Sequence, residues 1–441
     1  DEPKLAHFNL PMQIHRISEL PYRAPHFADG ILAQSERQDE YFTTLDLQKQ
    51  NIINAKIKEF VAERHYVGIY NAAALLINTE TMAVEAAVGS ADFFDSEIEG
   101  QVDGTRAMRS PGSLMKPFIY GLAIEEGLIH PHTLLKDAPR RYGLYSPENA
   151  DNGFLGPLFA QDALVYSRNI PAVDLMLELR EGSMIELLQK AGIKDLKDAD
   201  YYGAALALGG FEVTMEDVAR LYASLNNFGV IQPLKKLVEE EAETEADVSE
   251  PVRILTEEAA FIVRDMLRHN PQPKIYGSRG KIKTDIAWKT GTSFRFRDGW
   301  AAAVFDKYVL VVWVGNFNNL GNPAFMAKYS AAPLIFRMIN DLQYIIHFPP
   351  PDDEIPLGLN VKYVDICAST GELPLDFCPL YVPTLFIPGV SPTKTSDVFL
   401  RIPVDKATGL RACSSDPETT AWEVYAFWRA DMQESYEKAG A

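Results

Sequence analysis

The sequence predicts an α+β fold in which an antiparallel sheet is sandwiched by helices. Two β-prone runs, residues 72–78 and 83–89, are separated by a short turn. Two more, residues 300–305 and 308–315, contain many valine and aromatic residues and are joined by Asp-Lys. A long and largely helical stretch, residues 116–227, lies between these two hairpins. Strands at both ends of a region, with helices inserted between them, favour one sheet that is covered by helices.

Three further helices and an edge strand complete this architecture. The spacing of apolar residues predicts helices over residues 45–63, 256–268 and 331–344, and the prolines at 349–351 end the last of them. Residues 289–292 are expected to form a strand beside the second hairpin, at the edge of the sheet. This strand would then face the first helix of the long helical stretch.

Two or three structural units are expected, because 441 residues exceed the usual size of one domain. Residues 1–43 are predicted to be an irregular, proline-containing lead, and residues 44–348 to form the main domain. Residues 349–441 are predicted to form a small C-terminal appendix that is rich in proline and short β-prone runs. A helix over residues 419–437 is expected to end this appendix.

The charge of the chain limits its partners. Lys and Arg number 42 against 61 Asp and Glu, and the resulting net charge of −19 argues against binding of nucleic acid or anionic membranes. Residues 239–250 hold seven of the acidic side chains and are predicted to be a solvated, mobile loop. No apolar run reaches the roughly 18 residues that a membrane-spanning helix needs, and no secretory signal opens the chain.

Three short motifs carry the chemistry, and they are Ser113-Leu114-Met115-Lys116, Ser167-Arg168-Asn169 and Lys289-Thr290-Gly291-Thr292. A serine hydroxyl is a weak nucleophile near neutral pH and needs an adjacent base. On a helix, the spacing of three residues places Lys116 one turn from Ser113. Free N–H groups at the start of that helix favour negative charge that develops there. Burial beside a second cation, for which Lys289 is the candidate, would lower the pKa of Lys116 enough for it to act as a base.

The second and third motifs offer groups that can relay protons and hold a substrate. A hydroxyl at Ser167 and an amide at Asn169 suit these two tasks, although both residue types are also common in ordinary turns. Gly291 leaves room for a substrate backbone, so that an extended peptide can add to the sheet edge. Thr290 and Thr292 taken alone also fit ordinary strand threonines.

In this order the motifs resemble those of the active-site-serine penicillin-recognising enzymes. The flanking sequences Arg-Ser-Pro-Gly at 109–112 and Asp-Gly-Trp at 298–300 are similar to class A penicillin-binding proteins, as are residues 208–214. Residues 121–131 and 138–143 are similar to the 1C branch of that family. The resemblance implies a fold like that of penicillin-binding proteins and serine β-lactamases, with a D,D-transpeptidase activity on peptidoglycan stem peptides.

The resemblance also implies a role for each motif residue. Ser113 attacks the penultimate D-alanine carbonyl, and Lys116 is the base. Ser167 passes protons between the two lysines and the leaving nitrogen, while Asn169 holds the donor amide. The substrate carboxylate and acyl oxygen are held by Lys289, Thr290 and Thr292, and the backbone N–H groups of Ser113 and Thr292 form the oxyanion hole. Stem peptides and β-lactams are the implied ligands, other cell-wall or periplasmic proteins are further candidate partners, and no metal or organic cofactor is required.

Members of that family carry a membrane anchor and a glycosyltransferase domain ahead of this region. Neither is visible, so the chain is expected to be a transpeptidase fragment of a larger anchored protein on the periplasmic face of the inner membrane, with residues 1–43 as the linker. The three cysteines, Cys367, Cys378 and Cys413, are too few for a structural zinc set. Because the family works in an oxidising compartment, a Cys367–Cys378 disulfide is expected, with Cys413 either free or pairing in place of one of them.

Three alternatives to a transpeptidase share its acylation chemistry or its binding groove. A serine β-lactamase needs a deacylating base, and no Glu-x-x-Leu-Asn segment follows the second motif. A D,D-carboxypeptidase would pass the acyl group to water instead of to an amine. A penicillin sensor or silent scaffold would keep the binding groove and turn over no substrate, and only a kinetic assay separates it from the enzyme.

Overall fold

The computed structural model describes nearly all of the chain after the first 21 residues. The described residues are 22–34, 38, 40–143, 145–238, 250–273, 282, 284–351, 353–413 and 416–439. The acidic segment predicted to be a mobile loop lies outside them except for Glu250, so that expectation stays a prediction.

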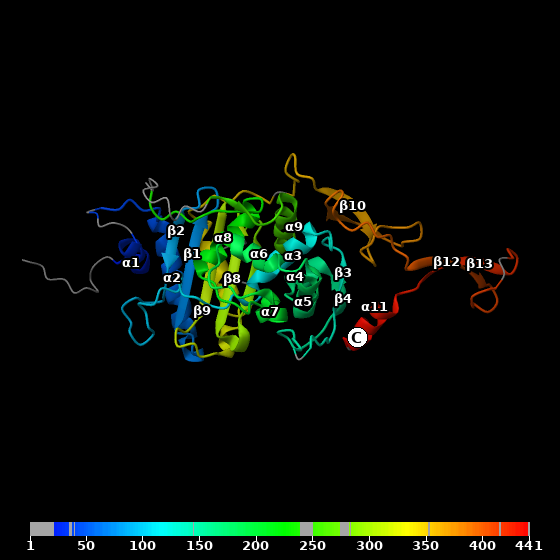
Figure 1. The fold of residues 1–441 in the computed structure, drawn as a ribbon, viewed down its shortest axis with the longest axis horizontal. Helices are drawn as coiled ribbons and strands as arrows, with labels where there is room; N and C mark the ends of the chain where they lie inside the picture. The colour runs from blue at the N-terminus through cyan, green and yellow to red at the C-terminus, as the bar shows by residue number, and fades with distance from the viewer. Residues whose placement is uncertain are drawn as a thin grey trace, which may run out of the picture.

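A five-stranded antiparallel sheet forms the centre of the molecule, with strand order β2-β1-β9-β8-β7 (Figure 1). Its strands are β1 (Asn71–Asn78), β2 (Val84–Val88), β7 (Ala287–Thr292), β8 (Asp298–Phe305) and β9 (Tyr308–Gly315). The N-terminal hairpin joins the C-terminal strands through β1 and β9, whose pairing runs from Asn71 opposite Gly315 to Asn78 opposite Tyr308. Every residue of β1, β8 and β9 is buried, as expected for strands that are covered on both faces.

Helices cover both faces of this sheet. One face packs against α2 (Leu47–Arg64) and α10 (Ala331–Leu342), and the other packs mainly against α8 (Met215–Asn226). Behind α8 lie α3 (Lys116–Glu125) and α9 (Glu257–Arg268). The predicted antiparallel sheet sandwiched by helices is confirmed.

Side-chain caps explain where several of these helices begin. Asp46 accepts hydrogen bonds from the N–H groups of Gln48 and Lys49 at the start of α2, and Thr256 caps α9. Thr214 and Asp217 form a reciprocal capping box on α8. Among the described residues, no helix combines the length and apolar character needed to cross a bilayer.

The long insert between the two main hairpins contains helices and one small hairpin that contacts the site. The helices after this small hairpin are α4 (Ala160–Val165), α5 (Asn169–Glu178), α6 (Ser183–Lys190) and α7 (Ala199–Tyr202). The hairpin pairs β3 (Leu134–Asp137) with β4 (Gly156–Phe159). The loop between these two strands returns to the start of α5, where the second motif lies.

The C-terminal appendix consists of two hairpins and a helix. The first hairpin pairs β10 (Lys362–Cys367) with β11 (Tyr381–Phe386), and the second pairs β12 (Phe399–Asp405) with β13 (Thr420–Ala426). The second hairpin extends away from the main body, and α11 (Ala430–Lys438) returns to contact β3 and β4 (Figure 1). The expected Cys367–Cys378 disulfide is present, and Cys413 is free and exposed.

The first hairpin of the appendix shares a core with the main domain. Val361, Leu385 and Ile387 are buried in the same apolar cluster as α3 and α9. The parts of the chain before and after residue 349 therefore pack against each other at this hairpin. That the appendix forms a structural unit of its own stays a prediction.

Two predicted elements are wrong. The helix expected over residues 419–437 is strand β13 in its first part, and only Ala430–Lys438 is helical. Trp422, Val424 and Tyr425 are β-prone, and pairing with β12 decides between the two conformations. The lead expected to be irregular contains α1 (Pro25–Gln34), because proline is well tolerated in the first turn of a helix and Phe27 and Ile31 find an apolar surface to bury.

Candidate active site

Ser113 lies in a 3-10 turn, η4 (Gly112–Met115), that leads directly into α3. Hydrogen bonds hold this turn on two sides: Tyr222 Oη donates to the Leu114 carbonyl at 2.9 Å, and Trp300 Nε1 donates to the Ser110 carbonyl at 3.0 Å. Gly112 has φ +53°, a conformation that favours glycine. The Ser113 side chain is half-buried, and among the described residues its hydroxyl has no hydrogen-bond partner. The predicted nucleophile thus lies on a turn that hydrogen bonds hold from α8 and β8.

Lys116 is completely buried and is surrounded by oxygen atoms of the second motif. Its Nζ donates to the Ser167 carbonyl at 2.6 Å, the Arg168 carbonyl at 2.9 Å and Asn169 Oδ1 at 2.6 Å. Burial lowers the pKa of Lys116 well below its usual range, the positive charges of Lys289 and Arg168 lower it further, and Asp137 opposes them. A lysine in these surroundings gives up its proton much more readily than one in water.

Lys289 reaches the same place from strand β7. Its Nζ donates to Ser167 Oγ at 2.6 Å and to the Thr290 carbonyl at 2.9 Å, and its side chain is completely buried. Burial lowers the pKa of Lys289 to about 7. Ser167 therefore accepts from both lysines, through its carbonyl and through its hydroxyl, with its backbone in the left-handed region at φ +59°.

Strand β7 lies directly against the turn that carries Ser113. A Cβ atom added to Gly291 would overlap the Pro111 carbonyl oxygen and lie 3.0 Å from the Leu114 nitrogen. The strand is at the edge of the sheet, as the sequence predicts. Thr292 Oγ1 accepts from the Ala327 N–H at 3.1 Å, so this threonine also has a structural role.

The eight predicted site residues thus converge from three segments: the η4–α3 junction, the start of α5 and strand β7. Asn169 is occupied in this structure. Its Oδ1 accepts from Lys116, and its Nδ2 donates to the Glu148 carbonyl at 2.5 Å. A substrate N–H that took the place of Lys116 at Oδ1 would release the lysine from this contact.

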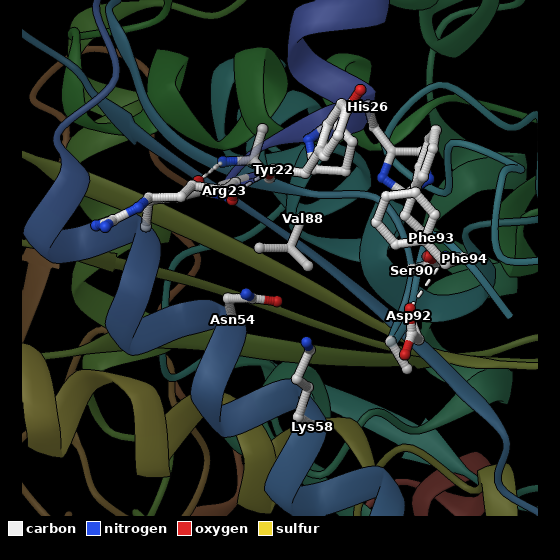
Figure 2. A pocket seen from close by; sticks show the side chains of 14 residues that line it. Tyr22, Arg23, His26, Asn54, Lys58, Val88, Ser90, Asp92, Phe93 and Phe94 are labelled. Atoms are coloured by element: carbon white, nitrogen blue, oxygen red, sulfur yellow. Dashed lines mark hydrogen bonds between the residues drawn. The ribbon is translucent and has the colours of Figure 1, made fainter. Parts of the chain in front are cut away.

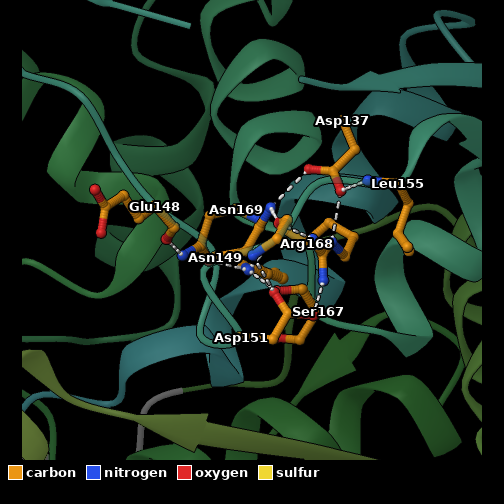
Figure 3. Close-up of polar contacts among 10 residues, drawn as sticks. Asp137, Glu148, Asn149, Asp151, Leu155, Ser167, Arg168 and Asn169 are labelled. Carbon is orange, nitrogen blue, oxygen red and sulfur yellow. Dashed lines mark hydrogen bonds and ion pairs between the residues drawn. The ribbon is translucent and has the colours of Figure 1, made fainter. Parts of the chain in front are cut away.

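A second group of residues, which no sequence pattern indicated, supports the motif. Figure 3 shows Arg168 beside Asp137, with Asn149 between Asp137 and Asn169. The sequence motif assigned a role to Ser167 and Asn169 but none to Arg168. No local pattern links it to Asp137, which lies 31 residues away.

A cavity elsewhere in the molecule lies apart from this site. A cavity of about 60 Å³ lies beside α1, α2 and the segment after β2, and is lined by Lys58, Phe93 and Phe94 among others (Figure 2). It adjoins β2, at the opposite edge of the sheet from β7, and holds none of the motif residues. Within the described part of the chain, no group of three or more His, Cys, Asp or Glu is placed to hold a metal ion.

Two bacterial penicillin-binding proteins illustrate the similarity of this chain to known proteins. The chain is 33% identical to penicillin-binding protein 1C of Escherichia coli over 330 residues, which are 74% of this chain and 41% of that protein. It is 32% identical to penicillin-binding protein 1F of Bacillus subtilis over 55% of this chain and 34% of that protein. The chain thus spans less than half the length of these relatives.

Solved structures share the fold. Penicillin-binding protein 1A of Haemophilus influenzae matches with a TM-score of 0.59 at 24% identity, covering 74% of this chain and 54% of that one. PonA1 of Mycobacterium tuberculosis, solved in complex with penicillin V, matches with a TM-score of 0.56 at 20% identity, covering 71% of this chain and 89% of that one. These matches confirm the predicted penicillin-binding-protein fold.

Family models match both parts of the chain. The model of the penicillin binding protein transpeptidase domain matches residues 72–328, more than half of the chain, and includes all three motifs. The model of the penicillin-binding protein 1A C-terminal domain matches residues 359–401 in the appendix. The chain therefore belongs to the penicillin-binding protein transpeptidase family.

Proposed function

We propose that this chain is a D,D-transpeptidase domain that cross-links peptidoglycan stem peptides through a serine acyl-enzyme and is acylated by β-lactams. One observation carries the proposal: two completely buried lysines from different elements meet at Ser167, beside the turn that bears Ser113. Within the described residues neither lysine has a carboxylate within 4 Å. Burying amines without a paired charge is costly, so a chemical role accounts for both better than a structural one.

Acylation begins when Ser113 Oγ attacks the carbonyl carbon of the penultimate D-alanine. The new C–O bond forms, the C–N bond breaks, and the terminal D-alanine leaves with a proton on its nitrogen. Lys116 takes the proton of Ser113. The Ser167 hydroxyl gives its proton to the leaving nitrogen and regains one from Lys289, whose Nζ lies 2.6 Å from Ser167 Oγ. An amine of a neighbouring stem then attacks the ester carbonyl: the new C–N bond forms, the C–O bond to Ser113 breaks, and the proton lost by the amine restores the Ser113 hydroxyl through Lys116. Water takes the place of the amine in the carboxypeptidase variant of the reaction.

The contacts of Lys116 indicate what must change for it to act as a base. Its three oxygen partners match the three donors of an ammonium group. A neutral amine with a lone pair directed at Ser113 has only two donors, so one contact must be released. Asn169 offers the one acceptor of the three on a rotatable side chain, and it is also the group proposed to hold the donor amide. Substrate binding at Asn169 would thus release Lys116.

Strand β7 supplies the remaining binding groups. The N–H groups of Ser113 and Thr292 are proposed to hold the oxyanion, and the close approach of β7 to the η4 turn supports this. Lys289, with Thr290, is proposed to bind the substrate carboxylate. Its pKa of about 7 leaves a large protonated fraction at neutral pH, and an arriving carboxylate would increase that fraction.

We also propose an extracytoplasmic, periplasmic setting, which the Cys367–Cys378 disulfide supports because such bonds persist in oxidising compartments. Stem peptides and β-lactams are the proposed ligands. A D,D-carboxypeptidase and a catalytically weak penicillin sensor remain the alternatives, and each makes the same acyl-enzyme.

Intact-mass measurement after mixing with benzylpenicillin tests the assignment. The wild type should gain the mass of one acyl group, and Ser113→Ala should gain none, because no other described serine lies one turn before a buried lysine in this arrangement. Labelling of the alanine variant at the wild-type rate would refute the nucleophile. Release of D-alanine from a stem pentapeptide, with and without an amine acceptor, separates the transpeptidase from the two alternatives.

A further inference from the structure

A buried ion pair joins Arg168, the middle residue of the second motif, to Asp137. Arg168 is 4% exposed, and Asp137, at the end of β3, is 0% exposed. The Arg168 Nε donates to Asp137 Oδ2 at 2.7 Å, its Nη1 donates to Asp151 at 2.8 Å, and its Nη2 donates to the Gly153 carbonyl. All three nitrogen atoms of the guanidinium therefore donate a hydrogen bond (Figure 3).

Asp137 and Asn149 extend this network to Asn169. Asp137 Oδ1 accepts from Asn149 Nδ2 at 2.9 Å, and Asp137 Oδ2 also accepts from the Leu155 N–H at 2.9 Å. The Oδ1 atom of the buried Asn149 in turn accepts from the Asn169 N–H at 2.8 Å. One oxygen of this carboxylate thus holds the Arg168 side chain, and the other holds the Asn169 backbone N–H through Asn149.

The segment held in this way supplies every oxygen that Lys116 contacts. The three acceptors are the carbonyls of Ser167 and Arg168 and the side chain of Asn169. Ser167 has φ +59°, and the end of α4 accounts for this conformation, because the N–H groups of Ser167 and Arg168 donate to the Leu164 and Ala163 carbonyls at 3.1 and 2.9 Å. The ion pair and Asn149 then hold the next two residues, Arg168 and Asn169.

We infer that the Arg168–Asp137 ion pair, linked to Asn169 through Asn149, is a positioning device that sets the location and charge environment of the Lys116 amine. The inference rests on the proposed acyl-enzyme function. Arg168, Asp137 and Asn149 are positioning residues, because none of them needs to touch the substrate. The charged groups that act on Lys116 are Lys289 from β7, Arg168 from the motif segment and Asp137 from β3.

The two members of the pair act on Lys116 in opposite directions. The positive charge of Arg168 lowers the pKa of Lys116, and the negative charge of Asp137 raises it. Because acylation needs neutral Lys116, the rate falls as the pH drops below its pKa. Arg168→Met should therefore move this acid limb to higher pH, and Asp137→Asn should move it to lower pH, each by roughly 0.5–1 unit.

The test is the second-order rate of benzylpenicillin acylation, followed by intact mass from pH 5 to pH 9. Both variants should also be at least ~10-fold slower above the acid limb, because the oxygens around Lys116 are no longer fixed. Asp151→Asn is the matched control: Asp151 bonds the same guanidinium, but its side chain is 61% exposed. Its rate should stay within about threefold of the wild type and its acid limb should not move.

Asn149→Ala tests the positioning of the second motif without changing the charges near Lys116. It also provides a test if Arg168→Met or Asp137→Asn does not fold. It removes the link to Asn169 and leaves both charges in place, so it should be slower by ~10-fold with an unmoved acid limb. A wild-type rate for this variant overturns the positioning role, as do acid limbs that move in the same direction in Arg168→Met and Asp137→Asn. A wild type that takes up no penicillin would instead refute the proposed function itself.

Discussion

At the scale of single residues, the main cost to the fold is the burial of two lysines. Lys116 and Lys289 are both completely buried and contact only neutral oxygen atoms among the described residues. An amine that is charged in the unfolded chain must lose its proton or its hydration when it is buried. In the proposed mechanism, both residues lower the stability of the fold and gain reactivity in return.

Replacing Lys289 with methionine should stabilise the protein and abolish normal acylation. The folded pKa of about 7 lies below the unfolded value near 10.4, so between these values the unfolded chain binds more protons. The free energy of unfolding of the wild type should then rise with pH from about 7 to about 10 through this group. Lys289→Met lacks this dependence, so its advantage, ~1–3 kcal/mol at pH 7, should shrink as the pH approaches 10.

Thermal unfolding at pH 7 and pH 9.5 measures this difference directly. Exposed Lys394→Met provides the control, and its melting temperature should change little and equally at both pH values. A Lys289→Met protein that is less stable than the wild type at pH 7 would show that its hydrogen bonds to Ser167 and Thr290 outweigh the burial cost.

At the scale of elements, the site depends on how closely strand β7 approaches the η4 turn. Gly291 faces the Pro111 carbonyl and the Leu114 nitrogen with no room for a side chain. Both neighbours are backbone atoms, which cannot rotate away as a side chain could. The strand and the turn therefore hold their spacing only while residue 291 is glycine.

Gly291→Ala should slow benzylpenicillin acylation by at least ~100-fold, because a displacement of about 1 Å at the nucleophile is enough for such a loss. Gly30→Ala in helix α1 is a suitable control, since its Cβ would meet only Arg106 Nη1 at 3.6 Å and alanine favours helices. That control should acylate normally. Rates within threefold of the wild type for Gly291→Ala would show that β7 can shift without affecting Ser113.

At the scale of the whole molecule, the appendix is joined to the main domain by packing as well as by the chain. Val361, Leu385 and Ile387 complete the apolar cluster around α3 and α9, whereas much of the surface of β12 and β13 is exposed. The two hairpins should therefore differ in their importance for stability.

Ending the chain after residue 348 should lower the melting temperature more than ending it after residue 396. The first truncation removes the three apolar side chains of the shared cluster, each worth about 1.5–3 kcal/mol, and the second leaves them in place. Differential scanning calorimetry on both proteins, with penicillin acylation as the check on the active site, measures the effect. Equal melting temperatures for the two truncated proteins would contradict a shared core.

Local patterns determined much of this protein. The order and spacing of the three motifs identified the candidate site, and hydrophobic periodicity predicted α2, α9 and the strands of the sheet. These features depend on residues that are close together in the chain. Helix-capping residues and the spacing of apolar residues can therefore be recognised in the sequence itself. The Cys367–Cys378 pairing followed from the family resemblance and is present in the structure.

Only the tertiary structure decided the features that depend on residues far apart in sequence. Lys289 meets Ser167 across 122 positions, and Arg168 meets Asp137 across 31, so neither contact leaves a local signal. The strand conformation of β13 likewise depends on its partner β12. The low pKa of each lysine is also a tertiary property, because removal of water by distant segments, and not the identity of its sequence neighbours, sets the energy of its charge.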